Sequence, residues 1–277
     1  MVTTHEPATG PTEQEQEEGT IASRDGTRIA YTRSGQGPPL VLVHGTTADH
    51  TRWAPILPAL EEHFTVYAVD RRGRAASGDA EDYAVEREFD DVAALVDSLP
   101  EPANLLGHSY GAICSLEAAL RTENLRKLVL YEPPIPSGIE IYPTEVVARI
   151  QSLVDAGDRE GAVVTFFREV VHAPPHELEQ LRSLPSWPAR VAAAHTIPRE
   201  MCGSDGYVFE PNRFSGLRTP TLLLLGGDSP PFLRAATEAV HSALPNSRIV
   251  TLPGQQHTAI NTAPELFVRE VLQFLQG

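Results

Sequence analysis

Cysteine is nearly absent from this chain, and its scarcity excludes whole classes of protein. The 277 residues include only Cys114 and Cys202, too few for a disulfide framework, and no C-x-x-C pair offers a zinc or redox site. Cys114 lies in an apolar helical stretch, where cysteine behaves as a small buried hydrophobe. His172 and His176 are four residues apart, but two intervening prolines prevent the helix that would align them on a metal. We therefore expect no metal and a reducing, cytoplasmic location.

Positive charge and long apolar runs are also scarce. Lys127 is the only lysine, and the formal net charge is −15. Nucleic acids and anionic membrane surfaces bind basic patches, so neither is an expected partner. No apolar run approaches the roughly 20 residues that span a bilayer. Residues 1–19 are polar and acidic, without the apolar core of a signal peptide, and we expect them to form a disordered tail.

Apolar residues nevertheless make up 41% of the chain, enough for a substantial core. A hairpin is predicted around the turn Asp25-Gly26, and short apolar strands then alternate with amphipathic helices. The expected strands are residues 20–23, 28–32, 40–43, 65–69, 103–106, 128–131, 221–225 and 248–252. The expected helices between them are residues 53–63, 88–99, 112–121, 232–244 and 264–274. This alternation predicts an α/β fold with a doubly wound, mostly parallel sheet.

The alternation stops after Glu132, at Pro133-Pro134. Residues 135–217 show no clear strand pattern and instead contain helical patches near residues 144–156, 160–171 and 176–184. We therefore expect residues 135–217 to form a helical lid, inserted between two late strands. Residues 20–134 and 218–277 would form the core of the fold.

The strongest chemical signal is the pentapeptide Gly107-His108-Ser109-Tyr110-Gly111, which matches G-x-S-x-G. A predicted strand leads into it and a predicted helix follows, as a nucleophilic serine on a tight turn requires. The flanking glycines let backbone approach closely, and the helix N-terminus can help to hold an oxyanion. Ser109 is therefore the predicted nucleophile.

A serine nucleophile needs a base, and the base needs an acid that orients it. His257 follows the last predicted strand, which places it at the same edge of the sheet as Ser109. Asp228 directly follows the strand at residues 221–225, and the order Ser109, Asp228, His257 is typical of this type of sheet. Glu132, at the end of the preceding strand, is an alternative acid, and we favour Asp228 from its strand-end position.

The oxyanion requires two converging donors. The backbone N–H of Tyr110 is one candidate, and that of Thr46, in the loop after the first buried strand, is the other. His44 is interpreted as a structural hydrogen-bonding residue. Phe166, Phe167 and Trp187 in the predicted lid either line a substrate pocket or form the packing of the lid itself.

These features together resemble the α/β-hydrolase superfamily, in its lid-bearing branch of serine esterases and perhydrolase-like enzymes. The resemblance covers residues 20–277 and rests on sequence motifs that occur in the expected order: His44-Gly45, Asp70-Arg71-Arg72-Gly73-Arg74, Gly107-His108-Ser109-Tyr110-Gly111, Gly227-Asp228 and His257. One position departs from the pattern, since Ala75 stands where the D-x-R-G-x-G-x-S loop has glycine. If this position needs a positive φ, alanine costs about 1 kcal/mol or more.

The resemblance implies a hydrolase without a cofactor that acts on a small-molecule substrate. The expected reaction is cleavage of a carboxylic ester, lactone or thioester through an acyl-enzyme on Ser109. Relatives that dehalogenate alkanes or open epoxides have an aspartate nucleophile, so the serine excludes them. The same triad could instead serve C–C bond hydrolysis, perhydrolysis or cyanohydrin cleavage, and a third reading is a non-catalytic small-molecule receptor.

Overall fold

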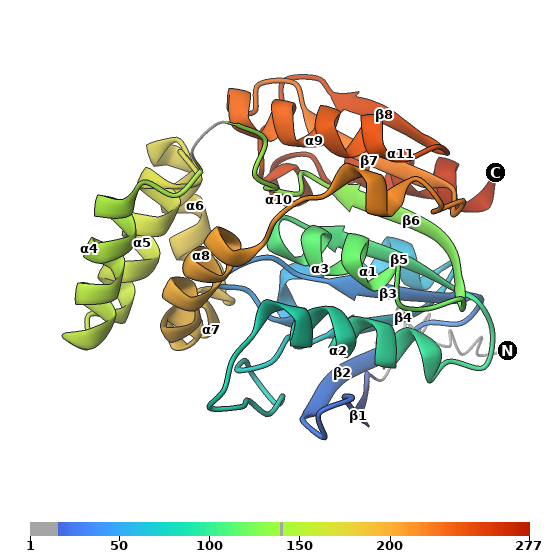
Figure 1. The fold of residues 1–277 in the computed structure, drawn as a ribbon, viewed down its shortest axis with the longest axis horizontal. Helices are drawn as coiled ribbons and strands as arrows, with labels where there is room; N and C mark the ends of the chain where they lie inside the picture. Colours follow the sequence, from blue (N-terminus) through green and yellow to red (C-terminus); the bar gives the residue numbers. More distant parts are fainter. Residues whose placement is uncertain (1–15, 139–140) are drawn as a thin grey trace, which may run out of the picture.

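A single twisted sheet forms the centre of the molecule in a computed structural model that describes residues 16–138 and 141–277, without the side chains of residues 202–206 (Figure 1). Its eight described strands follow the order β1-β2-β4-β3-β5-β6-β7-β8. They are β1 (Glu17–Ala22), β2 (Arg28–Ser34), β3 (Pro39–Val43), β4 (Thr65–Val69), β5 (Ala103–His108), β6 (Leu125–Tyr131), β7 (Thr221–Gly226) and β8 (Ser247–Leu252). Strand β2 pairs antiparallel with β1 and β4, and every pair from β4 to β8 is parallel. The predicted α/β fold with a mostly parallel sheet is confirmed.

Strand β1 begins earlier than the sequence suggested. Glu17 lies opposite Arg33 of β2 and forms an ion pair of 2.7 Å with it, and Gly19 lies opposite Tyr31. The prediction that the tail extends to residue 19 is therefore wrong for residues 17–19, because edge-strand pairing outweighs their polar composition. Residues 1–15 of the predicted tail lie outside the described part of the chain.

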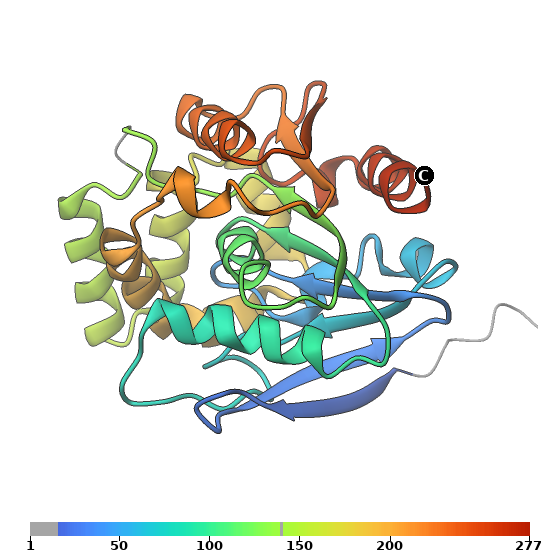
Figure 2. The ribbon, with the colours of Figure 1, turned by 45° about the vertical axis from the view of Figure 1, so that its right-hand side comes forward.

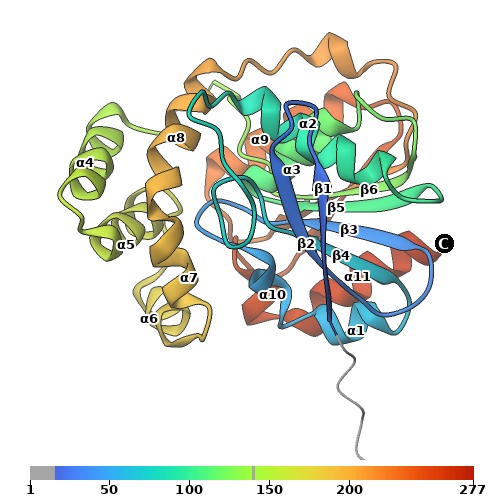
Figure 3. The same cartoon turned by 90° about the horizontal axis from the view of Figure 1, so that it is seen from below.

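Helices cover both faces of the sheet (Figures 2 and 3). One face carries α2 (Val85–Asp97), α3 (Tyr110–Ala118) and α9 (Pro231–Ala243), and the other carries η1 (His50–Trp53), α1 (Leu57–Glu61), α10 (Ala259–Thr262) and α11 (Pro264–Gln276). Successive side chains of a strand point to opposite faces, so β3 contributes to the hydrophobic cores on both sides of the sheet. Val41 and Val43 belong to the first core, under α2, α3 and α9, and Leu40 and Leu42 belong to the second. Cys114 is buried in the first core, as predicted.

A helical insertion between β6 and β7 lies beside the sheet and confirms the predicted interruption (Figure 1). It contains α4 (Thr144–Asp155), α5 (Arg159–Glu169), α6 (Pro175–Ser183), α7 (Trp187–Ala192), η2 (Ala193–Thr196), α8 (Ile197–Gly206) and η3 (Pro211–Phe214). We call α4–α8 the lid. Its α7 and α8, which the sequence did not predict, pack with α4 and α5 around a separate hydrophobic cluster that includes Ile150, Phe166 and Ile197. None of the helices in the described ranges is long and apolar enough to cross a membrane.

Buried ion pairs fix one end of the lid to the core. Glu200 of α8 accepts from Arg71 at 2.9 Å and also contacts Arg74, and both arginines belong to the loop after β4. Arg71 bonds Glu88 of α2 at 2.7 Å as well, and its guanidinium lies 4.6 Å from the centre of the Tyr110 ring. Because all these charges are buried and mutually paired, this network holds α8 against the elements that carry the serine turn.

Candidate active site

Ser109 occupies the tight turn that its sequence context predicts. Strand β5 ends at His108 and α3 begins at Tyr110, so Ser109 alone makes the reversal, with φ 56° and ψ −126°. A Cβ on Gly107 would lie 2.5 Å from the carbonyl oxygen of Gly111, and a Cβ on Gly111 would lie 2.3 Å from that of Val43. Both glycines are therefore required by close backbone approach, and they let the structure keep the serine in a strained conformation.

Glu132, not Asp228, is the acidic partner of His257. The imidazole Nδ1 of His257 lies 2.5 Å from Oε2 of Glu132, which is fully buried just after β6. The other oxygen, Oε1, accepts hydrogen bonds from the Gly226 N–H at 2.7 Å and from the Ser229 hydroxyl at 2.5 Å. The carboxylate is thus fixed by the end of β7 and the loop after it, and it fixes the ring of His257 in turn.

Asp228 follows β7 as predicted, but its side chain is exposed and the structure does not bring it to His257. The backbone explains the difference: the N–H of Gly226 turns toward Glu132, and that of Asp228 donates to Gln255 at 2.9 Å. This path leads the chain over the carboxylate of Glu132 and turns the side chain of Asp228 outward. The alternative acid considered from the sequence is therefore the one that reaches the histidine.

The two predicted oxyanion donors lie in segments adjoining Ser109. Tyr110 is the first residue of α3, so its N–H has no partner within the helix. Thr46 lines both cavities that reach Ser109, and a Cβ on the preceding Gly45 would approach the Ser109 Cβ to 2.9 Å. His44 is structural, as interpreted: it is buried, Nδ1 donates to the Gly45 carbonyl at 2.8 Å, and Nε2 accepts from a backbone N–H.

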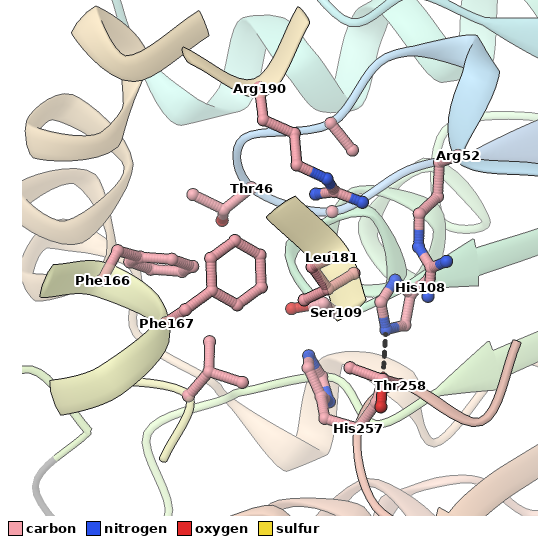
Figure 4. Close-up of a pocket in the computed structure, with 13 residues that line it drawn as sticks. Thr46, Arg52, His108, Ser109, Phe166, Phe167, Leu181, Arg190, His257 and Thr258 are labelled. Carbon is pink, nitrogen blue, oxygen red and sulfur yellow. Dashed lines mark hydrogen bonds between the residues drawn. The ribbon is translucent and has the colours of Figure 1, made fainter. Parts of the chain in front are cut away.

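Two cavities meet at Ser109 and His257, and they differ in chemistry; Figure 4 shows the one that contains Arg52 and Arg190. The apolar cavity is lined mainly by side chains from the lid, its flanking loops and α9, among them Ile141, Val170, Val171, Phe232 and Leu233. The second cavity, which we call the arginine cavity, also has apolar walls but contains His108, Arg52 and Arg190. Its volume is about 30 Å³, room for little more than one or two water molecules.

All three aromatic residues pack in the core of the lid, and two of them also line a cavity. Phe166 lines both cavities and Phe167 lines the arginine cavity, so these two residues combine the two roles considered from the sequence. Trp187 lines neither; it is buried within the lid, where its indole N–H donates to Glu160 at 3.3 Å. The prediction of a pocket role for Trp187 is corrected to lid packing, because α7 directs Arg190 rather than Trp187 toward the serine (Figure 4).

Arg52 and Arg190 are functional candidates that sequence reasoning missed. Each is only 5% exposed, and among the described residues neither has a carboxylate within 4.0 Å. Arg190 donates to the Thr47 hydroxyl at 3.1 Å, and Arg52 donates to the amide oxygen of Asn261. Burial lowers the pKa of Arg52 to about 9 and that of Arg190 to about 10. No local sequence signal distinguishes such arginines from the many on the surface.

His108 supports the histidine of the site. Its ring stacks on Tyr131 with centroids 4.9 Å apart, and its Nε2–H donates to the carbonyl of His257 at 3.1 Å (Figure 4). Burial, and to a smaller extent the nearby His257, lowers the pKa of His108 well below its ordinary value. A neutral ring that donates from Nε2 leaves Nδ1 as an acceptor, and this buried atom has no hydrogen-bond partner among the described residues.

A mostly parallel sheet covered on both faces, a serine on a strained strand-to-helix turn and a histidine held by a buried acid define the α/β-hydrolase class. Residues 40–270 match the model of the alpha/beta hydrolase family, and the chain belongs to that family. It is similar to an alpha/beta hydrolase from Sphaerobacter thermophilus, with 37% identity and a TM-score of 0.81 over 93% of this chain and all of the other.

Two curated relatives are similar over most of their length. A 2-(acetamidomethylene)succinate hydrolase from Mesorhizobium japonicum is 27% identical over 88% of this chain and 90% of its own. A pimeloyl-[acyl-carrier protein] methyl ester esterase from Aeromonas hydrophila is 27% identical over 89% of this chain and 99% of its own. Because these two names describe different substrates, the similarity supports hydrolysis in general and does not select one substrate.

Proposed function

We propose that this protein is a serine hydrolase that cleaves small-molecule carboxylic esters, lactones or thioesters, with Ser109, His257 and Glu132 as its triad. The observation that carries the proposal is the contact of 2.5 Å between His257 and Glu132 beside a serine that lines the same cavity. The esterase name of one curated relative agrees with this chemistry.

The proposed reaction begins with proton transfer. His257, held through Nδ1 by Glu132, takes the Ser109 proton on Nε2 as the serine oxygen attacks the carbonyl carbon. The C–O double bond opens to an oxyanion. The tetrahedral intermediate then collapses, the bond to the leaving alcohol or thiol breaks, and His257 returns the proton to it. A water molecule repeats the sequence on the acyl-enzyme and releases the acid.

The proposed oxyanion hole combines the backbone N–H groups of Tyr110 and Thr46. Tyr110 lies at the N-terminus of α3, where the unpaired amide and the helix dipole favour negative charge. Thr46 follows Gly45, whose missing Cβ allows the loop after β3 to pass against Ser109. All groups that the reaction requires thus come from this chain, and the mechanism needs no cofactor.

Covalent labelling tests the proposal directly. A fluorophosphonate should add one equivalent to Ser109, detected by intact mass, and Ser109→Ala should abolish the adduct. The same variant should lower kcat for p-nitrophenyl acetate by at least about 10⁴-fold while remaining folded. Ser152→Ala, an exposed serine on α4, is the matched control and should keep full activity.

Two outcomes would redirect the proposal. Absence of an adduct on folded protein would favour a non-catalytic receptor. Labelling of Ser109 together with inertness toward every ester, lactone and thioester in a panel would instead favour C–C bond hydrolysis, perhydrolysis or cyanohydrin cleavage by the same triad.

A further inference from the structure

We propose that the substrate carries a free carboxylate, and that Arg52 and Arg190 bind it in the arginine cavity beside Ser109. The inference rests on the proposed function and adds the substrate class. It comes from two buried cations that line the nucleophile's cavity and lack acidic partners among the described residues.

The two arginines reach the cavity from different parts of the fold. Arg52 lies on η1, which follows the loop after β3, whereas Arg190 lies on α7 of the lid. Figure 4 shows both guanidinium groups to one side of Ser109, with Phe166 and Phe167 on the other. Both arginines also line a neighbouring cavity of about 220 Å³ between the lid and the core. They therefore stand between the nucleophile and further space into which a substrate can extend.

The charge of this cavity contrasts with that of the whole protein. The chain has a formal net charge of −15, yet of the residues that the structure describes, no aspartate or glutamate lines the arginine cavity or the adjoining cavity of about 220 Å³. The carboxylate of Asp49 favours the charge of Arg190, but it already accepts from the N–H and hydroxyl of Thr51. Positive charge is thus concentrated where the substrate must lie.

Burying two unpaired cations side by side is costly, since both lose water and repel each other. The hydrogen bonds of Arg190 to Thr47 and of Arg52 to Asn261 use only part of their donors. In the described part of the chain, the buried Nε of Arg190 has no hydrogen-bond partner. An anion between the two guanidinium groups would fill these unmet donors and balance both charges.

The space and the geometry favour a carboxylate over a larger anion. The arginine cavity has a volume of about 30 Å³, so a small anionic group fits it better than a bulkier one. A planar carboxylate matches the fork of a guanidinium and is the smallest common organic anion. Because one arginine belongs to the lid and the other to the core, such a substrate would also hold the lid closed over Ser109.

Paired esters that differ only in charge test the inference. Monomethyl glutarate and methyl 4-carbamoylbutanoate have the same length, but the first ends in a carboxylate and the second in an amide. We expect kcat/KM for the carboxylate to exceed that for the amide by about 10- to 100-fold, the effect of a charge-assisted hydrogen bond. Monomethyl succinate and adipate, with their amides, determine the best length.

The variants Arg52→Gln and Arg190→Gln should each reduce this preference at least tenfold, and Arg52→Lys and Arg190→Lys should retain part of it. Arg168→Gln removes an exposed charge from the lid and should leave the preference intact. Thermal unfolding of each variant shows whether it is folded. Calorimetric titration of Ser109→Ala with glutarate and with inorganic phosphate measures binding without turnover.

Equal kcat/KM for the paired esters, with ester cleavage intact, would overturn the carboxylate site and leave the proposed function standing. Tighter binding of phosphate than of glutarate would also overturn it, in favour of a phosphorylated substrate. Arginine-dependent binding of glutarate without cleavage of any ester would support the anion site and reject the esterase function.

Discussion

Replacing Glu132 by glutamine tests whether Glu132 or Asp228 is the acid that serves His257, because the change keeps the side-chain shape and removes its charge. Oε1 of Glu132 accepts from Gly226 and Ser229, so these donors should fix the amide oxygen of glutamine at that position. The amide nitrogen then faces Nδ1 of His257 and donates to it. The histidine must carry its own proton on Nε2, toward Ser109, and can no longer accept the serine proton.

The size of the effect follows from the contact itself. Two unit charges about 4 Å apart attract by about 4 kcal/mol at an effective dielectric constant of about 20, a suitable value for the imidazolium that forms during attack. The lost charge-assisted hydrogen bond is partly the same energy as this Coulomb attraction, so the total loss is only slightly larger, about 4–5 kcal/mol. We therefore expect Glu132→Gln to lower kcat by roughly 10³- to 10⁴-fold.

The assay is turnover of p-nitrophenyl acetate, together with the rate at which a fluorophosphonate labels Ser109. Asp228→Asn is the matched control, since it removes one charge from the exposed loop after β7, and it should change kcat less than threefold. The reasoning fails if folded Glu132→Gln keeps a tenth of the activity, or if Asp228→Asn causes the larger loss.

Two further predictions concern stability. Ala75 is exposed and has a φ of 43°, so the glycine usual at this position would relieve backbone strain. We expect Ala75→Gly to stabilise the fold by about 0.5–1 kcal/mol after its entropic cost, measured as a rise in Tm of roughly 2 °C. An unchanged or lower Tm would contradict this. Burial opposes the charge of Glu88, but Arg71 and Arg74 outweigh it and hold its pKa below the ordinary 4.5. The stability that Glu88 contributes is therefore present above pH 4.5 and lost as pH falls through its folded pKa. In denaturant titrations, the destabilisation by Glu88→Gln should be largest at neutral pH and shrink in acid, and a difference independent of pH would reject the assignment.

Local sequence was sufficient where chemistry depends on neighbours along the chain. The turn at Ser109 needs an apolar strand, two glycines and a helix in direct succession, and all of these are readable in order. The strands of the parallel sheet were equally visible, because burial on both faces demands continuous apolar runs. The predicted first strand began too late, at residue 20, because residues 17–19 carry no apolar signal. The stability of β1 comes from pairing with β2 rather than from its own side chains.

The amino-acid sequence by itself determined which reactive residues follow which strands: a serine after one strand, acids after the next two, and a histidine after the last. Only the tertiary structure decided which acid serves the histidine, because the choice depends on the N–H of Gly226, 94 residues from Glu132, turning toward that carboxylate. It also decided that Arg52 and Arg190 lie together beside the nucleophile, since whether an arginine is buried depends on how the lid packs on the core and not on its sequence neighbours.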